Sequence, residues 1–387
     1  MIMKRFLIWL VSGTTILLCF LLTTVNHAPK SSCPCAAEPK QCLSFLDKYP
    51  IDAVITYVNG SDPRLQAQLA AYAGKYENYM AADRSRFDDH QDLKYLLRSI
   101  DKFGKMFRNI YLVVAFESQT PYWLNRSQTR LKVVYHSDIW YNSSYLPAFN
   151  SIAIEGSLYR IQNLSELYVE FNDDLMLLSQ VEPEDFFTEI SPGKFRLKYR
   201  YDLSYSFLTY YPEKTISSHW VNPAVNAAKL VAQVCPNVTQ FKAYAKFPCH
   251  TPCPMLRSVL QDAEKEPMVF EAMDRTWQSR VRSNHSTGMK QMAQWYGYCK
   301  GLVEAEVLGC EQMYRFNFRP DAGKPEDVEA AKKHLQNAAE IIFARSLKFL
   351  VSSDEGTGKV TPHGREVENV LNAWRNRMFP KKSSFEL

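Results

Sequence analysis

Short apolar runs alternate with amphipathic stretches along residues 51–178. Residues 51–58, 110–115 and 131–136 are rich in β-branched and aromatic side chains, which predicts strands. Residues 88–103 place apolar side chains three or four positions apart, which predicts a helix, and residues 151–159 can form another. Because strand and helix alternate, we expect an α/β fold with a largely parallel, Rossmann-like sheet flanked by helices.

The C-terminal part of the chain has a different pattern. A helical periodicity covers residues 222–234, and a longer one covers residues 326–349. We therefore expect the sheet of the N-terminal half to be followed by a helical C-terminal part.

An acidic pair interrupts the apolar run at residues 167–178. Asp173 and Asp174 follow Phe171 and Asn172 directly. Adjacent carboxylates in apolar surroundings need a partner for their charge, and a hard divalent cation such as Mg²⁺ or Mn²⁺ is the simplest one. The alternative is a turn in which both acids are solvated. The pattern alone leaves both interpretations open.

A continuous apolar segment lies near the N-terminus. Residues 6–25 follow Lys4 and Arg5 and are long enough to cross a bilayer, which predicts an uncleaved signal anchor with a cytoplasmic tail at residues 1–5. A cleaved signal peptide is the alternative. Residues 26–49 lack periodicity and are typical of a stem, so the folded body at residues 51–387 is expected to enter the secretory pathway.

Composition and cysteine usage support this organisation. The 387 residues are 46% hydrophobic and can bury a large core. The net charge is only +5 and there is no long run of basic residues, so the sequence gives no sign of nucleic-acid binding. Eight cysteines lie outside the apolar segment, which is consistent with disulfides; a zinc site at Cys249 and Cys253 is the alternative. Six sequons fit a lumenal surface: Asn59, Asn125, Asn142, Asn163, Asn237 and Asn284.

Four separated regions resemble the Stealth family of sugar-phosphate transferases. The first is Ile51-Asp52-Ala53-Val54-Ile55-Thr56-Tyr57-Val58-Asn59-Gly60-Ser61-Asp62-Pro63. The second comprises Arg86-Phe87-Asp88-Asp89-His90, Leu93-Lys94-Tyr95, Leu97-Arg98-Ser99-Ile100, Leu146-Pro147-Ala148-Phe149-Asn150-Ser151, Ile154-Glu155 and Phe171-Asn172-Asp173-Asp174. The third is His250-Thr251-Pro252 with Arg280-Val281-Arg282-Ser283. The fourth is residues 349–354 and 379–387, where Ser353 stands in place of the family's usual Asn before Asp354.

The resemblance implies a GT-A-like, nucleotide-sugar-binding sheet and a phosphotransferase. Such an enzyme transfers a sugar-1-phosphate, of a hexose, an N-acetylhexosamine or a pentose, from a UDP-sugar to a hydroxyl of a glycan or glycoprotein and releases UMP. Its site must neutralise phosphoryl charge and activate a hydroxyl. Two alternatives remain, namely a metal-dependent glycosyltransferase that releases UDP and a catalytically weak homologue that binds sugar nucleotides or glycans. The expected location is a Golgi or other secretory-pathway membrane, single-pass type II with a lumenal catalytic part.

The resemblance also suggests roles for individual residues. Asp173 and Asp174, with Asp354, would hold Mg²⁺ or Mn²⁺, and Asp174 would also act in catalysis. His250 is the candidate general base, with phosphate binding as its alternative role. Arg280, Arg282 and Arg98 would clamp phosphoryl oxygens, the alternative for each being a surface ion pair. The remaining donor-binding candidates are Asp52, Asn59, Gly60, Asp62 and Asn150.

Overall fold

The computed structural model describes residues 44–73, 87, 89–204, 206–210, 221–319, 321–354 and 360–387, except for the side chains of residues 73, 209, 210 and 354. The predicted tail, the predicted anchor and most of the predicted stem lie outside these residues. Residues 44–387 form one compact unit. Within the described ranges no helix is both long and apolar enough to cross a membrane.

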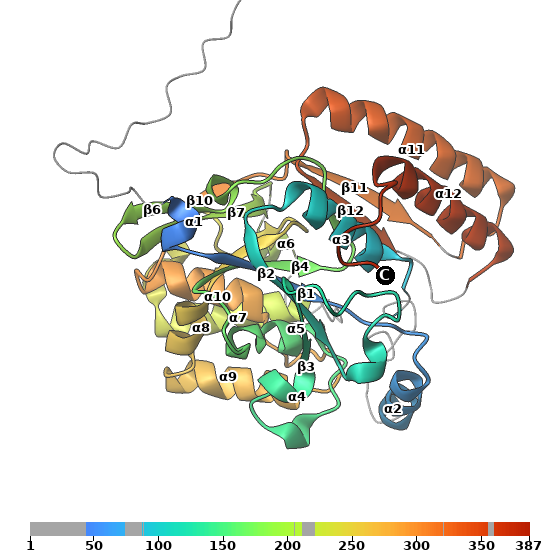
Figure 1. The fold of residues 1–387 in the computed structure, drawn as a ribbon. Helices are drawn as coiled ribbons and strands as arrows, with labels where there is room; N and C mark the ends of the chain where they lie inside the picture. The colour runs from blue at the N-terminus through green and yellow to red at the C-terminus, as the bar shows by residue number, and fades with distance from the viewer. Residues whose placement is uncertain are drawn as a thin grey trace, which may run out of the picture. The chain divides into compact units, whose positions relative to one another are not determined.

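A five-stranded sheet forms the centre of the fold (Figure 1). Its strands lie in the order β3 (Leu131–Tyr135), β2 (Phe107–Val114), β1 (Ile51–Thr56), β4 (Leu167–Asn172) and β9 (Cys253–Leu256). The first four are parallel and β9 is antiparallel to β4. The predicted largely parallel, Rossmann-like α/β sheet is therefore confirmed.

The central strands are apolar because both faces of the sheet are covered. All side chains of β1 from Ile51 to Ile55 are buried, as expected for a parallel strand between two layers. Helix α3 (Asp92–Phe103) packs its apolar stripe inward and ends at Gly104. The predicted helix began four residues earlier; Gln91, with a φ of 64°, precedes the observed start.

Two smaller sheets extend the fold. One consists of β10 (Glu304–Leu308), β7 (Lys194–Asp202) and β6 (Phe187–Ser191), with β8 (Phe247–Pro248) paired to β7. The other has the order β11 (Met313–Phe318), β12 (Phe349–Asp354) and β5 (Leu175–Leu177). Thus the apolar run at residues 167–178 is two strands in two different sheets, and the acidic pair is the turn between them.

Helices cover these sheets in two groups. In Figure 1, α11 (Pro325–Arg345) and α12 (Pro362–Met378) lie side by side near the third sheet, which confirms the helical C-terminal part. The helix α10 (Met289–Cys299) packs against α7 (Val221–Val234) in the other group. The remaining helices are α1 (Phe45–Lys48), α2 (Pro63–Ala73), α4 (His136–Ile139), α5 (Ser151–Glu155), α6 (Phe207–Tyr210), α8 (Arg257–Ala263) and α9 (Pro267–Gln278).

Two predicted helices are too long. The predicted helix at 326–349 ends at Arg345, because Ser346 adopts a left-handed conformation with a φ of 49° and Phe349 begins β12. The predicted helix at 151–159 ends at Glu155 and is followed by a short 3₁₀ turn at Leu158–Arg160. In both cases apolar residues that continued the helical pattern belong to the next element.

The short helix α1 falls within the predicted stem and contacts the folded body. Lys48 pairs with Glu189 of β6 at 2.8 Å, and the ring of Tyr49 packs edge-on against Phe195 at 4.9 Å. Residues 44–49 are therefore joined to the second sheet.

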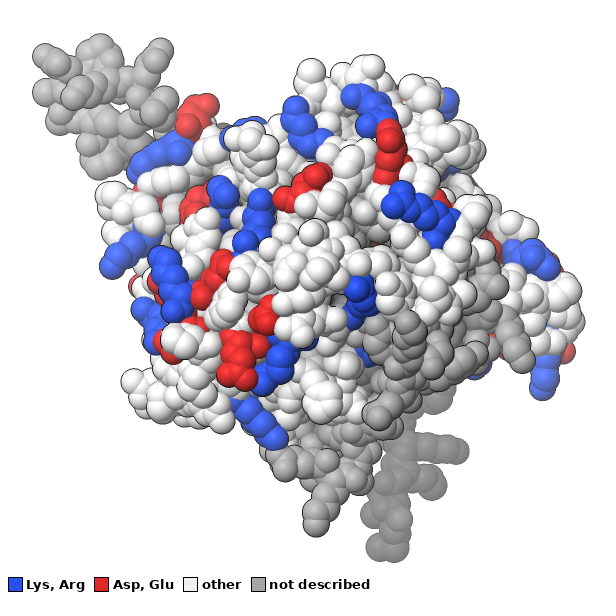
Figure 2. Space-filling view, turned by 90° about the horizontal axis from the view of Figure 1, so that it is seen from below, with Lys and Arg blue, Asp and Glu red and all other residues white. Residues whose placement is uncertain are grey.

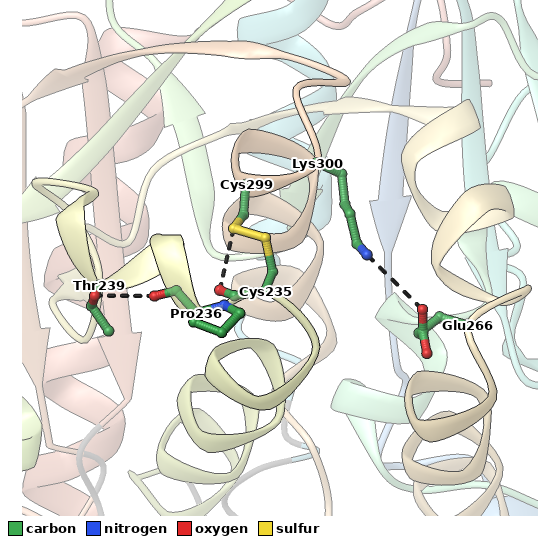
Figure 3. The surroundings of a disulfide bond; sticks show 6 residues. All are labelled: Cys235, Pro236, Thr239, Glu266, Cys299 and Lys300. Atoms are coloured by element: carbon green, nitrogen blue, oxygen red, sulfur yellow. Dashed lines mark hydrogen bonds and ion pairs between the residues drawn. A yellow bond between two sulfur atoms is a disulfide. The ribbon is translucent and has the colours of Figure 1, made fainter.

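Two disulfides hold the helical and loop regions. Cys235–Cys299 joins the end of α7 to the end of α10 (Figure 3), and Cys249–Cys310 joins the loop before β9 to the loop before β11. Cys253 is free and buried. Because Cys249 is in a disulfide, the alternative zinc site at Cys249 and Cys253 is wrong.

Acidic and basic side chains are interspersed over much of the face drawn in Figure 2. Intermixed charges largely cancel at a distance. The electrostatic potential over that part of the surface therefore has no single dominant sign.

Candidate active site

The site lies where the carboxyl ends of β1 and β4 are neighbours. Thr56 at the end of β1 is in register with Asn172 at the end of β4, and the strand order reverses between these two strands. A cavity of about 780 Å³ opens here, lined by Thr56, Tyr57, Asn172, Asp173 and Asp174 among others. In open α/β sheets ligands bind at such a switch point, and the volume is within the roughly 300–1,000 Å³ range of ligand pockets.

Asp174 and His250 form the central pair of this cavity. His250 Nε2 lies 3.1 Å from Asp174 Oδ1. Burial alone would raise the pKa of Asp174, but the charge and hydrogen bond of His250, helped by Arg315, lower it below its ordinary value. An ionised carboxylate only accepts hydrogen bonds, so Nε2 is the donor, and a neutral imidazole in this tautomer carries its lone pair on Nδ1.

The loop that carries His250 is tied down on both sides. Cys249 is linked to Cys310, and its backbone N–H donates to the carbonyl of Arg200 in β7. β9 begins at Cys253, three residues after His250, and pairs with β4. These links place the imidazole against the acidic turn that follows β4.

Asp173 lines the cavity close to other acidic side chains. Burial, and then the charges of Asp174, Asp92 and Asp89, raise the pKa of Asp173 well above its ordinary value. A divalent cation would relieve this repulsion, and Mg²⁺ commonly uses one or two carboxylates together with water and phosphate oxygens. Among the described residues no three His, Cys, Asp or Glu side chains gather around one point. The acidic pair therefore fits an ion that takes its other ligands from water or substrate.

Arg282 reaches the same cavity from the segment after α9. Its guanidinium donates to Ser151 Oγ at the start of α5, with a distance of 3.1 Å from Nε. Burial lowers the pKa of Arg282, and the carboxylate of Glu155 opposes that shift. Arginine stays protonated even so, and its remaining donors can bind an anion.

Glu155 and Lys290 line the cavity at its inner end, and neither had been assigned a role from the sequence. Lys290 Nζ lies 2.9 Å from Glu170 Oε1 in β4 and 3.7 Å from Glu155 Oε1. Burial alone would lower the pKa of Lys290, but these two carboxylates outweigh it and raise the pKa. Glu155 belongs to the stretch that resembles the second Stealth region, whereas Lys290 is in no motif.

Residues of the third sheet close the cavity on its other side. Arg315 of β11 and Ser352 and Ser353 of β12 line it, and Ser353 Oγ lies 3.5 Å from Asp174 Oδ2. Arg315 was not expected, because a single arginine in a strand gives no sequence signal. Asp354 is the last residue of β12, and its side chain lies outside the described structure.

Asp92 also lines the cavity and supports this wall. It forms an ion pair with the buried Arg375 of α12, and both side chains hydrogen-bond to the hydroxyl of Ser352. The backbone N–H of Ser352 donates to the carbonyl of Asp174 at 3.1 Å. The start of α3, the middle of β12 and the end of α12 thus meet beside the acidic turn.

The candidates from the first region divide between the two ends of β1. Asp52 is near the amino end, where Arg108 and the backbone N–H groups of Asn109 and Ser165 bind its carboxylate, and it does not line the cavity. Asp62 caps α2 through the N–H of Leu65. Asn59 is held by Gln119 and Ser61. These contacts make Asp52 a structural residue at the opposite edge from the site.

Gly60 sits in a tight loop beside Asn59. A Cβ atom on Gly60 would lie 2.0 Å from the carbonyl oxygen of Phe87, so this position excludes any larger residue unless the backbone shifts. Phe87, in contrast, lines the cavity. Asn59, Gly60 and Asp62 therefore shape the loop behind the lining and do not themselves line it.

Arg98 and Arg280 also lie outside the cavity lining. Arg98 is buried in a two-bond ion pair with Glu386 and donates to the carbonyl of Phe379. Arg280 donates to the carbonyls of Ser144, Tyr145 and Pro147. Both arginines are occupied in holding chain segments together.

Asn150 acts in the same way beside Arg282. It is fully buried, and its amide donates to the carbonyl of Ser279 and to Ser286 Oγ. It thereby fixes the segment that carries Arg282 next to the start of α5. Of the sequence candidates, the structure brings together Asp173, Asp174, His250 and Arg282.

Comparison with known proteins identifies two conserved regions in the chain. Residues 49–77 match Stealth protein conserved region 1, and residues 86–194 match Stealth protein conserved region 2. These ranges contain β1, α3 and the acidic turn. His250 and Arg282 lie outside both ranges.

Several bacterial phosphotransferases are similar to the chain. An exopolysaccharide phosphotransferase of Streptomyces coelicolor is 33% identical over 278 residues, which cover 72% of this chain and 43% of that protein. The receptor polysaccharide phosphotransferase WefC of Streptococcus oralis is 32% identical over 267 residues, 63% of this chain and 77% of that protein. The capsular polysaccharide phosphotransferase fcs1 of Haemophilus influenzae is 39% identical over 140 residues, 36% of this chain and 38% of that protein.

The chain spans less than half the length of the Streptomyces and Haemophilus relatives, but more than two thirds of WefC. The chain is 32% identical to WefC over 77% of that protein, and it contains both conserved regions. The chain belongs to the Stealth family of sugar-phosphate transferases.

Proposed function

We propose that this protein transfers a sugar-1-phosphate from a UDP-sugar to a hydroxyl of a glycan or glycoprotein, forming a phosphodiester and releasing UMP. The observation that carries the proposal is the contact of 3.1 Å between His250 and Asp174, at the switch point of the sheet, in one cavity with Arg282. The pair supplies a base, and the arginine supplies positive charge for a phosphoryl group. The relatives' names, all polysaccharide phosphotransferases, support the same reaction class.

The bonds that change are those of the β-phosphorus. The acceptor hydroxyl loses its proton to His250 Nδ1, its oxygen bonds to the β-phosphorus, and the bond from that phosphorus to the bridging oxygen breaks, so that UMP leaves. Asp174 stabilises the imidazolium that forms, because its carboxylate accepts from Nε2–H at 3.1 Å. Arg282 binds the phosphoryl oxygens whose charge grows in the transition state.

A divalent cation fits the acidic pair. Asp173 and Asp174 would hold it, and when bound it neutralises charge on the diphosphate. The carboxyl group of Asp173, whose pKa is raised by burial and by its acidic neighbours, is the feature of the chain that favours such an ion.

The test is the identity of the released nucleotide. The full-length protein is incubated with a panel of UDP- and GDP-sugars, Mn²⁺ and a glycan acceptor, and the nucleotide products are separated. UMP or GMP with a phosphodiester-linked product supports the proposal. UDP release would establish the alternative glycosyltransferase, and binding of a sugar nucleotide without product would establish the catalytically weak homologue.

A matched pair of histidine variants ties the activity to the site. His250→Gln removes the base and is expected to lower turnover by roughly 10²–10⁴-fold. His285→Gln changes an exposed histidine three residues after Arg282 and is expected to keep full turnover. Equal activity in both variants would refute the role of His250.

The proposed location is a Golgi or other secretory-pathway membrane, single-pass type II, with residues 6–25 as the anchor and the described body in the lumen. Two disulfides support an oxidising compartment. The sequons at Asn142, Asn163 and Asn237 are exposed, as glycan acceptors must be. Protease protection of the body in intact microsomes would test the orientation; digestion without detergent would contradict it.

A further inference from the structure

The inner end of the cavity holds a group of charges that the proposed mechanism does not use. Lys290 of α10 is only 15% exposed and lies between Glu170, 1% exposed, and Glu155, 14% exposed. Glu155 also acts on the charge of Arg282. Burial raises the pKa of Glu170 to about 7, and the charge of Lys290 opposes that shift. Lys290 and Glu155 therefore form a compensated cation and carboxylate pair, and this part of the cavity is polar but carries little net charge.

The buried partner of Lys290 lies further back along β4 than the acidic turn. Glu170, which does not itself line the cavity, precedes Asn172 by two residues, so it is one pleat repeat, roughly 7 Å, further from the carboxyl end of the strand. Asn172, Asp173 and Asp174 line the cavity at that carboxyl end, where the diphosphate is expected. The inner group is thus placed to meet what is attached to the diphosphate.

The neighbouring amide is already occupied. Gln294, one helical turn after Lys290, donates to Cys253 Sγ at 2.8 Å and accepts from the hydroxyl of Tyr201. An ammonium has three donors and a carboxylate has two acceptor oxygens. Lys290 and Glu155 both line the cavity and retain hydrogen-bonding capacity there.

A compensated donor and acceptor pair suits a neutral polyol better than a phosphate. A phosphate would require an excess of positive charge, whereas a sugar hydroxyl both donates and accepts and can bridge an ammonium and a carboxylate. We propose that Lys290 and Glu155 bind hydroxyl groups of the sugar ring of the nucleotide donor and so determine which sugar-1-phosphate is transferred. Glu170 is a positioning residue that holds Lys290. The inference deepens the proposed function and rests on a nucleotide-sugar donor.

The test separates the sugar from the nucleotide. Dissociation constants of the full-length protein are measured by calorimetry, with Mn²⁺ and without acceptor, for UDP, for UDP-glucose, UDP-galactose and UDP-N-acetylglucosamine, and for UDP-xylose. The ratio of the dissociation constant of UDP to that of the UDP-sugar measures how much the sugar ring contributes to the affinity. In Lys290→Met the sugar loses one hydrogen bond to a charged group. For the sugar that the wild type prefers, this ratio is therefore expected to fall about tenfold or more. The dissociation constant of UDP should stay within about twofold of the wild-type value.

Two further variants complete the design. Glu155→Gln keeps the shape of the side chain and is expected to lower the same ratio, so that the conclusion does not depend on the fold of Lys290→Met alone. Lys300→Met is the matched control, because Lys300 follows the same helix, pairs with Glu266 at 3.9 Å and does not line the cavity (Figure 3). Its ratio should equal that of wild type.

Several results would overturn the inference. An equal loss of UDP and UDP-sugar affinity would mean that Lys290 serves the nucleotide or the fold, and unchanged ratios in Lys290→Met and Glu155→Gln would mean that neither residue contacts the ring. A wild type that binds none of these three UDP-sugars, nor the pentose donor UDP-xylose, better than UDP would also refute it. Failure of the proposed function is distinguishable, since it would be detected as UDP release or absent product in the turnover assay, independently of these ratios.

Discussion

The disulfide beside His250 allows a sharp test of how the site is positioned. Replacing both Cys249 and Cys310 by serine frees the His250 loop from the loop that leads into β11 and Arg315. The two cysteines are 61 residues apart, and a closed loop of that length corresponds to about 4.3 kcal/mol of lost chain entropy at 25 °C. That is the largest loss of unfolding free energy expected from this change.

The second disulfide provides a matched control. Cys235 and Cys299 are 64 residues apart, for which the same relation again gives about 4.3 kcal/mol. Cys299 ends α10 nine residues after Lys290, and neither cysteine lines the cavity. The two double variants should therefore lose similar stability while differing in activity.

The expected difference is in turnover. Misplacing a reacting group by about 1 Å can lower the reaction rate roughly 10²-fold. The kcat of the Cys249→Ser/Cys310→Ser variant should therefore fall by up to that factor. The Cys235→Ser/Cys299→Ser variant should keep the wild-type kcat. Guanidinium unfolding measures the stabilities, and nucleotide release measures kcat well below both unfolding midpoints. Equal kcat in the two variants would show that the disulfide next to His250 only stabilises the chain, and the positioning argument would be wrong.

Three other changes test separate parts of the structure. Asp174→Asn should lower kcat by roughly 10²–10⁴-fold because Nε2–H of His250 loses its ionised acceptor, and near wild-type nucleotide release would contradict this. Exhaustive chelation should abolish turnover and added Mn²⁺ should restore it; activity that survives chelation would exclude the cation. Glu386→Gln should lose about 3–5 kcal/mol at neutral pH, since it leaves the buried Arg98 without its charge partner. Burial opposes ionisation of Glu386, but Arg98 lowers the pKa of Glu386 below 4.5. The stabilisation by this ion pair is therefore present above pH 4.5 and is lost as the pH falls through the pKa of the folded state. The unfolding midpoints of wild type and variant should converge in acid.

The first strand was predictable because its signal is local. The apolar run at 51–58 predicted a strand, and the turn residues after it predicted where the chain leaves the sheet. The run at 167–178 left open whether Asp173 and Asp174 form a turn, and its division between two sheets was not predicted. The same reasoning should have excluded Asp52. It is the second residue of β1, so in a parallel sheet it lies at the amino edge, away from the ligand side.

The contacts of Arg98 and Lys290 could not be derived from the sequence. The neighbours of Arg98 along its helix suggested a surface pair, whereas its partner Glu386 is 288 positions away and buried with it. Lys290 joins α10 to β4 and α5, and a lysine in an amphipathic helix is ordinarily solvated. Such pairs depend on which elements become neighbours in space, and no local pattern carries that information.

The ion pair between Asp92 and Arg375 affects when the site can be completed during synthesis. Asp174 leaves the ribosome about 200 residues before Arg375, roughly 10 to 40 s earlier at about 5–20 residues per second. During that interval the four parallel strands of the central sheet can form, but the wall made by β11, β12 and α12 is incomplete. The nascent protein is therefore expected to stay inactive until its last helix has docked, and termination between Asp174 and Arg375 should give a chain that retains the acidic pair without a working site.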